Sequence, residues 1–156
     1  MLSAVAEARR VLKPAGLLLD IHPTDEPATL HVWHARYSLG GELTDQPETL
    51  EAIHRTPIGE LDHASDSLSD FTATTDALAE ALEGAGGFEL AQTTLFDYRY
   101  FFDSLDELTE YLEDEWENAT ASDALLERAL LVMQQAATPP KVVVVQQAVV
   151  TVLRKL

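Results

Sequence analysis

The spacing of apolar residues predicts alternating helices and strands in the first and last parts of the chain. Helical spacing over residues 3–12 is followed by Leu17–Ile21, a continuous apolar run typical of a strand covered on both faces. Helical spacing returns from Asp76 and ends at the glycines within residues 84–87. In Phe88–Phe102, aromatic positions alternate with polar ones. This alternation predicts a strand with one buried and one solvated face.

Three further elements are predicted after this strand. Ser104 and Glu107 fit a capping box, which predicts a helix that begins there. The apolar stripe of this helix consists of Leu105, Leu108, Leu112 and Trp116. A second helix is predicted around Leu125–Met133, and Pro139–Pro140 ends it. Val142–Leu153 is apolar at both strand parities, so we expect this strand in the middle of a sheet.

Residues 22–75 have a weaker pattern, and prolines divide them into short pieces. We interpret this segment as an insertion. Thr29–Tyr37 and Glu42–Thr44 stand on either side of Gly40–Gly41, an arrangement that predicts a β-hairpin.

The rest of the insertion has fewer signals. Pro47 suits the first position of a short helix that reaches about Ile53. Residues 55–75 contain few apolar anchors and are predicted to form a surface loop. The complete pattern is that of an α/β protein with roughly three core strands, in a single domain over residues 1–156.

Composition narrows the possible functions. The chain has 156 residues, of which 27 are Asp or Glu and 10 are Lys or Arg, so its formal net charge is −17. This charge opposes binding to nucleic acid and to anionic membrane surfaces. The absence of cysteine excludes disulfides and thiolate chemistry and favours the cytoplasm. No apolar stretch is long enough to span a bilayer, so we expect a globular cytoplasmic protein that does not enter membranes.

The run from Ala6 to Asp20, AEARRVLKPAGLLLD, resembles the "RVLKPGG" segment of class I S-adenosylmethionine-dependent methyltransferases. In that family this segment leads into the fifth strand of a seven-stranded Rossmann-like sheet. Ala15 replaces the first glycine of the pair. The resemblance implies that Phe88–Phe102 is the sixth strand. It also implies that Val142–Leu153 is the antiparallel seventh strand, inserted between the fifth and the sixth.

The resemblance covers only the C-terminal half of the family's fold. The family binds its cofactor mainly in the other half, through a glycine-rich loop and an acidic residue that have no counterpart here. Glu83–Phe88 is rich in glycine but lies after a predicted helix and before a predicted strand, the reverse of a nucleotide-binding loop. We therefore interpret it as a helix end. The family implies S-adenosylmethionine, yet we expect no cofactor for the isolated chain and assign no catalytic, cofactor-binding or metal-binding residue.

The missing half leaves Leu17–Ile21 without the parallel strand that neighbours it in the family. An unpaired apolar edge strand promotes aggregation, so it needs a cover. Self-association as a homodimer is one solution, and a partner chain that carries the missing half is another. A third possibility is a truncated chain that folds poorly. Three functions follow as hypotheses: a truncated, methyltransferase-like interaction domain; a methyltransferase completed by a partner chain or by dimerisation; and a small-molecule binding module.

Asp20 and His22 occupy the best position for chemistry. They share one parity at the C-terminal end of the first strand, where open α/β sheets usually bind ligands. A histidine beside a carboxylate can act as a general base, although such a pair is often only a solvated rim.

The other candidates have simpler explanations. His31 and His34 face opposite sides of a strand, which disfavours a shared metal, and His54 and His63 are expected in surface loops. The acidic face Asp106–Glu117 is interpreted as a solvated helix face. The remaining candidates are the aromatic residues Trp33, Tyr37 and those of the segment Tyr98–Phe102. They can pack in a core, in a dimer interface or around a pocket.

Overall fold

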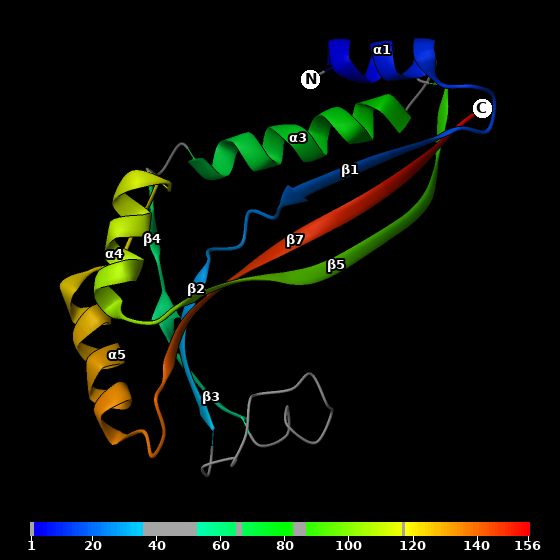
Figure 1. The fold of residues 1–156 in the computed structure, drawn as a ribbon. Helices are drawn as coiled ribbons and strands as arrows, with labels where there is room; N and C mark the ends of the chain where they lie inside the picture. The colour runs from blue at the N-terminus through cyan, green and yellow to red at the C-terminus, as the bar shows by residue number, and fades with distance from the viewer. Residues whose placement is uncertain (1, 36–52, 65–66, 83–86, 117) are drawn as a thin grey trace. The chain divides into compact units, whose positions relative to one another are not determined.

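The computed structural model describes residues 2–35, 53–64, 67–82, 87–116 and 118–156 (Figure 1). The helices in these ranges are α1 (Leu2–Val11), α3 (Ser67–Leu82), α4 (Leu105–Asp114) and α5 (Asp123–Gln135). The strands are β1 (Leu17–Pro23), β2 (Thr29–Ala35), β3 (Ile53–Glu60), β4 (Asp62–His63), β5 (Phe88–Phe102), β6 (Ala119–Thr120) and β7 (Lys141–Lys155). The described chain is therefore of the α/β class, with a mostly antiparallel sheet.

The chain divides into two compact units. Unit 1 contains residues 1–26, 65–98 and 146–156, and unit 2 contains residues 27–64 and 99–145. Each of the long strands β5 and β7 has one end in unit 1 and the other end in unit 2.

Unit 1 is built on strand β7. β1 pairs with β7 in antiparallel orientation, from Leu17 opposite Arg154 to Pro23 opposite Ala148. β5 also pairs with β7, so β7 lies between β1 and β5 (Figure 1). The expectation that the last strand is central and antiparallel to the first is confirmed.

Helices α1 and α3 cover one face of this part of the sheet. Their shared core consists of Val5, Leu78, Phe88 and Leu153, with Leu12, Leu18 and Leu82 packed against it. The Nζ group of Lys155 donates to the carbonyls of Arg9 and Leu12, at 2.6 Å each. These two bonds satisfy carbonyls at the C-terminal end of α1 and tie that end to β7.

The prediction that Leu17–Ile21 is covered on both faces is wrong. Leu18 packs under the helices, whereas Leu17, Leu19 and Ile21 are 50%, 58% and 62% exposed. A continuous apolar run shows only that the side chains on both faces of the strand are apolar. It does not show whether other elements of the fold pack against one face or against both.

Unit 2 packs α4 and α5 against a second part of the sheet. β2 pairs in antiparallel orientation with β7, from Thr29 opposite Val145 to Trp33 opposite Lys141, and also with β3. The largest fully buried side chains of the unit 2 core are Leu30, Val32, Leu108, Leu125, Val142 and Val144. The predicted cap of α4 is confirmed, because Ser104 Oγ accepts from the Glu107 amide at 3.1 Å and Glu107 Oε2 accepts from the Asp103 amide at 2.6 Å.

Two other predictions are wrong, the loop over residues 55–75 and the helix start at Asp76. Residues 55–75 are not a loop, because they contain most of β3, all of β4 and the start of α3 at Ser67, nine residues before the predicted start at Asp76. The short helix from Pro47 and the hairpin turn at Gly40–Gly41 lie outside the described residues. In the described chain, β2 pairs in antiparallel orientation with β3.

The predicted alternation of burial along β5 is also wrong. Only its two ends, Phe88 and Phe102, are buried, at 3% and 6% exposed, while Leu90 and Tyr98 are about half exposed, at 51% and 52%. Each end lies in one of the two cores, and the middle of the strand lies in neither. Among the described residues, none of the helices combines the length and the apolarity needed to cross a bilayer.

Candidate functional site

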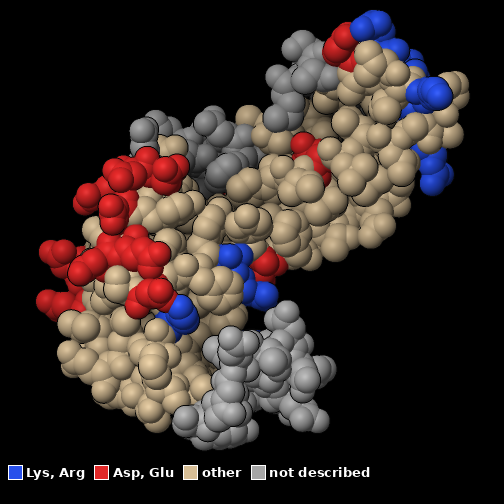
Figure 2. All heavy atoms as spheres, in the orientation of Figure 1, with Lys and Arg blue, Asp and Glu red and all other residues tan. Residues whose placement is uncertain are grey.

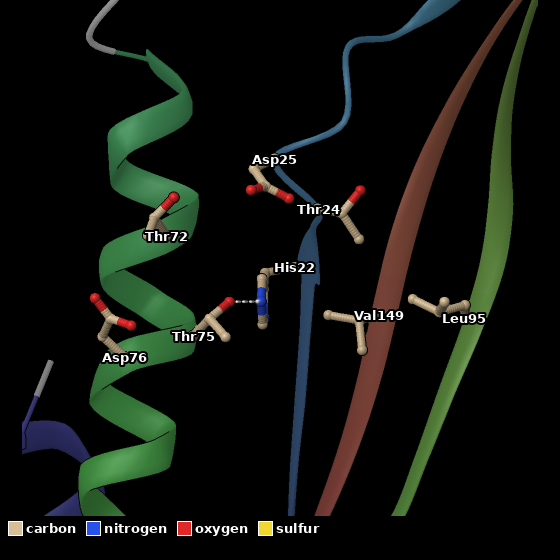
Figure 3. A pocket seen from close by; sticks show the side chains of 8 residues that line it. All are labelled: His22, Thr24, Asp25, Thr72, Thr75, Asp76, Leu95 and Val149. Atoms are coloured by element: carbon tan, nitrogen blue, oxygen red, sulfur yellow. Dashed lines mark hydrogen bonds between the residues drawn. The ribbon is translucent and has the colours of Figure 1, made fainter.

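Asp20 and His22 form a contact at the end of β1, on the face covered by α3. His22 Nδ1 lies 2.5 Å from Asp20 Oδ2, and the two side chains are 10% and 23% exposed. An ionised carboxylate can only accept, so the Nδ1–H group of His22 donates to Asp20. The lone pair of the neutral ring then lies on Nε2, which points at the Thr75 hydroxyl at 3.4 Å (Figure 3).

A pocket of about 290 Å³ opens beside this pair. Its lining comes from the end of β1, from α3, and from β5 and β7: His22, Thr24, Asp25, Thr72, Thr75, Asp76, Leu95 and Val149 (Figure 3). The polar groups lie toward α3 and the chain after β1, and the apolar wall is formed by Leu95 and Val149. All of these residues belong to unit 1.

This arrangement is that of an oriented imidazole at the edge of a small cavity. A carboxylate on Nδ1 fixes the tautomer and the ring plane, which leaves Nε2 as a proton acceptor toward the pocket. The sequence pattern identifies Asp20 and His22 but not Thr72 and Thr75, because it predicts a loop for these two residues. The spacing of Thr72, Thr75 and Asp76, three and four apart, is the local signal that fits one helical face.

The uncovered face of β1 is the second feature of unit 1. Leu17, Leu19 and Ile21 point away from α1 and α3, and their partners on the same face of β7 are Arg154, Val152 and Val150. Arg154 NH1 lies 3.2 Å from Glu89 Oε1, so the charged group at the end of this face is paired. Within the described residues, no strand pairs with the other edge of β1.

The remaining histidines lie in unit 2. His31 and His34 make separate contacts: His31 Nε2 lies 2.9 Å from Thr29 Oγ1, and His34 Nδ1 lies 3.1 Å from the Ala35 carbonyl. His54 lies in β3 rather than in a loop, directly opposite His34, with the ring centroids 5.2 Å apart. Local sequence patterns do not reveal this pair, because it depends on the pairing of two strands that are distant in the sequence.

His63 lies in β4 and has a structural role that its predicted loop position concealed. Its Nε2 accepts a hydrogen bond from the Ala28 amide at 3.1 Å, and its ring meets Trp116 edge-on at 6.1 Å. Burial lowers the pKa of His63, against the smaller opposing effect of the nearby Asp62 carboxylate. The neutral form is the one that can accept from Ala28.

The described acidic residues of α4 form a solvated face, in agreement with the simple interpretation of Asp106–Glu117. They are Asp106, Glu107, Glu110, Glu113 and Asp114, and all are exposed. Figure 2 shows acidic side chains gathered over the position of α4. Glu117 lies outside the described residues.

Trp33 forms an aromatic and cationic cluster in unit 2. Its ring meets Phe101 at 5.6 Å, Arg55 lies 4.6 Å from the ring centroid, and Arg99 lies 5.8 Å away. The cluster combines edge-to-face and cation–π packing, as expected for a strand surface. Tyr37 lies outside the described residues, so its role stays a prediction.

Within the described part of the chain, no group of three or more His, Asp or Glu side chains is placed to hold a metal ion. No protein-family model, curated protein or solved structure matches the sequence or the fold of this chain.

Proposed function

We propose that this chain is an interaction domain that acts as a homodimer, in which a second copy covers the open edge and the bare face of β1. One observation carries this proposal. Leu17, Leu19 and Ile21 stand in a row on one side of β1 and are all at least half exposed. Isolated exposed apolar residues are ordinary, whereas a contiguous row on an unpaired edge strand is a typical association site.

The charge distribution favours this face over others for self-association. The chain carries a net charge of −17, so two copies repel each other over most of their surfaces. The paired residues of β1 and β7 put no carboxylate on the bare face, and the neighbouring Arg154 is already paired with Glu89. Two copies therefore meet here without bringing unpaired like charges together.

A two-fold axis predicts the register of the pair. In an antiparallel β1–β1 ladder centred on Leu19, the Leu19 residues of the two copies stand opposite each other, and Leu17 stands opposite Ile21. The apolar rows of both copies then join on one face. A ladder centred on Asp20 would place two carboxylates directly opposite each other, which is unfavourable. We therefore assign the axis to Leu19.

The evolutionary context that we propose is a truncated methyltransferase-like domain without methyl transfer of its own. Its support is the resemblance of residues 6–20 together with the position of β7 between β1 and β5. The sequence lacks counterparts of the family's cofactor loop and acidic residue. In this interpretation, dimerisation replaces the contacts that the other half of the fold makes in the family.

A second candidate is a methyltransferase completed by a partner chain or by the second copy. The contact between Asp20 and His22 favours it, because an oriented base stands at a strand end beside a pocket. That same pocket is also the support for a small-molecule binding module.

The test is the solution mass by light scattering, followed by calorimetric titration of S-adenosylmethionine into the same sample. We expect twice the mass of the 17.1 kDa chain and no heat of cofactor binding. A monomer at all concentrations would contradict the interaction domain. Saturable cofactor binding would contradict the proposal that the chain has no methyltransferase function, and it would favour the second candidate.

A further inference from the structure

We propose that His34 and His54 form a binding site for one divalent transition-metal ion of the zinc and copper class. The two histidines belong to unit 2, whereas β1 belongs to unit 1, and the proposed site does not depend on the proposed dimer. Four observations on β2 and β3 lead to it.

The first is the strand register. His34 of β2 stands directly opposite His54 of β3 in an antiparallel pair, so both side chains project from the same face of the sheet. Cross-strand partners keep their Cβ atoms about 5 Å apart, which lets two imidazoles reach one ion.

The second is the separation of the rings. The centroids of His34 and His54 are 5.2 Å apart, with an angle of 54° between the ring planes. Two imidazoles that bind one tetrahedral ion at about 2.0–2.1 Å from each nitrogen have centroids about 5 Å apart. The observed spacing therefore accommodates the ion without a large strand movement.

The third is the state of the ring nitrogens. His34 Nδ1–H donates to the Ala35 carbonyl at 3.1 Å, which leaves the lone pair on Nε2. A backbone carbonyl on the second nitrogen is the usual outer-shell partner of a metal-binding histidine. Within the described residues, His54 makes no hydrogen bond and is exposed, so its ring is available to turn toward the ion.

The fourth is the space above the pair. A pocket of about 490 Å³ is lined by His34, His54, Thr56, Val132 and Gln135. None of these described lining residues carries a carboxylate, and imidazole with neutral oxygen ligands suits zinc, copper and nickel rather than calcium or magnesium. With two protein nitrogens as ligands, the remaining positions are open to water or to a small anionic ligand.

The experiment uses the metal-free full chain without a polyhistidine tag and titrates it calorimetrically with zinc chloride alone. We expect one ion for each chain. His54→Ala, at an exposed position, and His34→Ala should each weaken binding at least tenfold. His31→Ala is the matched control on the same strand, and it should leave binding unchanged.

A repeat with copper(II) should give tighter binding, in line with the usual order of metal affinities. Imidazole nitrogen NMR shifts on zinc addition then identify the ligands directly. The proposal is overturned if the wild type binds no zinc, if His54→Ala binds as the wild type does, or if His22→Ala removes binding instead. Circular dichroism of each variant shows whether a loss of binding reflects a loss of fold.

Discussion

The substitution Ile21→Asp tests the β1 interface. Ile21 is 62% exposed and stands opposite Val150 on the bare face of unit 1. Full burial of an isoleucine side chain stabilises by roughly 1.5–3 kcal/mol, so covering the exposed part contributes about 1–2 kcal/mol in each copy. Two copies lose about 2–4 kcal/mol, and each also brings a carboxylate into an apolar contact, which adds a desolvation cost.

The expected total loss is at least about 3 kcal/mol, which weakens the dimer by about a hundredfold or more. Sedimentation velocity over a concentration series measures this loss as a shift from dimer to monomer. Because Ile21 is exposed within its own chain, the monomer should keep the circular dichroism of the wild type.

Leu131→Asp is the matched control. Leu131 is 57% exposed, but it belongs to α5 in unit 2, whereas β1 belongs to unit 1. This variant should dimerise as the wild type does. Equal dissociation of both variants, or a dimer unaffected by Ile21→Asp, would refute the assignment of the interface.

Two further predictions concern stability. The pKa of His63 in the folded state lies below its unfolded value of about 6.5. The contribution of neutral His63 to the free energy of unfolding is therefore fully present above that pH, and it decreases as the pH falls through and below it. His63→Gln keeps an acceptor for Ala28 without titrating. The fall in the free energy of unfolding between pH 7.5 and pH 5, measured by urea denaturation, should therefore be smaller in this variant than in the wild type; an equal fall in both proteins would contradict this role. Gly87 has a φ of +69°, a backbone conformation that residues with a Cβ rarely adopt, and an added Cβ would contact the Arg9 side chain, so Gly87→Ala should destabilise the fold by about 1–3 kcal/mol in the same assay. A Gly87→Ala chain as stable as the wild type would contradict the strain argument.

Elements with strong local signals were predictable from the sequence. The capping box at Ser104 and the stripe of Leu108 and Leu112 identified α4, because both depend on residues within one or two turns. β7 was recognised as central because it is apolar at both parities. In each case, the contacts that determine the structure of the element are made within the element or by a whole face of it.

Features that depend on distant partners were not predictable. β3 contains Pro57 and several polar residues, and it is a strand because β2 pairs with it across a shift in register at Leu30 and His31. The same pairing brings His34 and His54 together. Local composition suggested a loop there, and tertiary pairing overrode it.

The candidate site was half predictable for a similar reason. Asp20 and His22 share a strand parity, which sequence spacing reveals, and the structure confirms their contact. Thr75 contacts His22 from 53 positions away, through the packing of α3 on β1. The exposed face of β1 was missed because the number of layers on a sheet is a property of the whole fold.

The most direct test of the central claim is disulfide trapping of Leu19→Cys. The chain has no cysteine, so the new thiol has no competitor, and a two-fold axis at Leu19 brings the two thiols together. Leu131→Cys, with closely matched exposure, is the control. Under mild oxidation the interface model predicts a covalent dimer for Leu19→Cys, formed much faster than for Leu131→Cys. Equal rates, or a Leu19→Cys chain that stays monomeric, would contradict it.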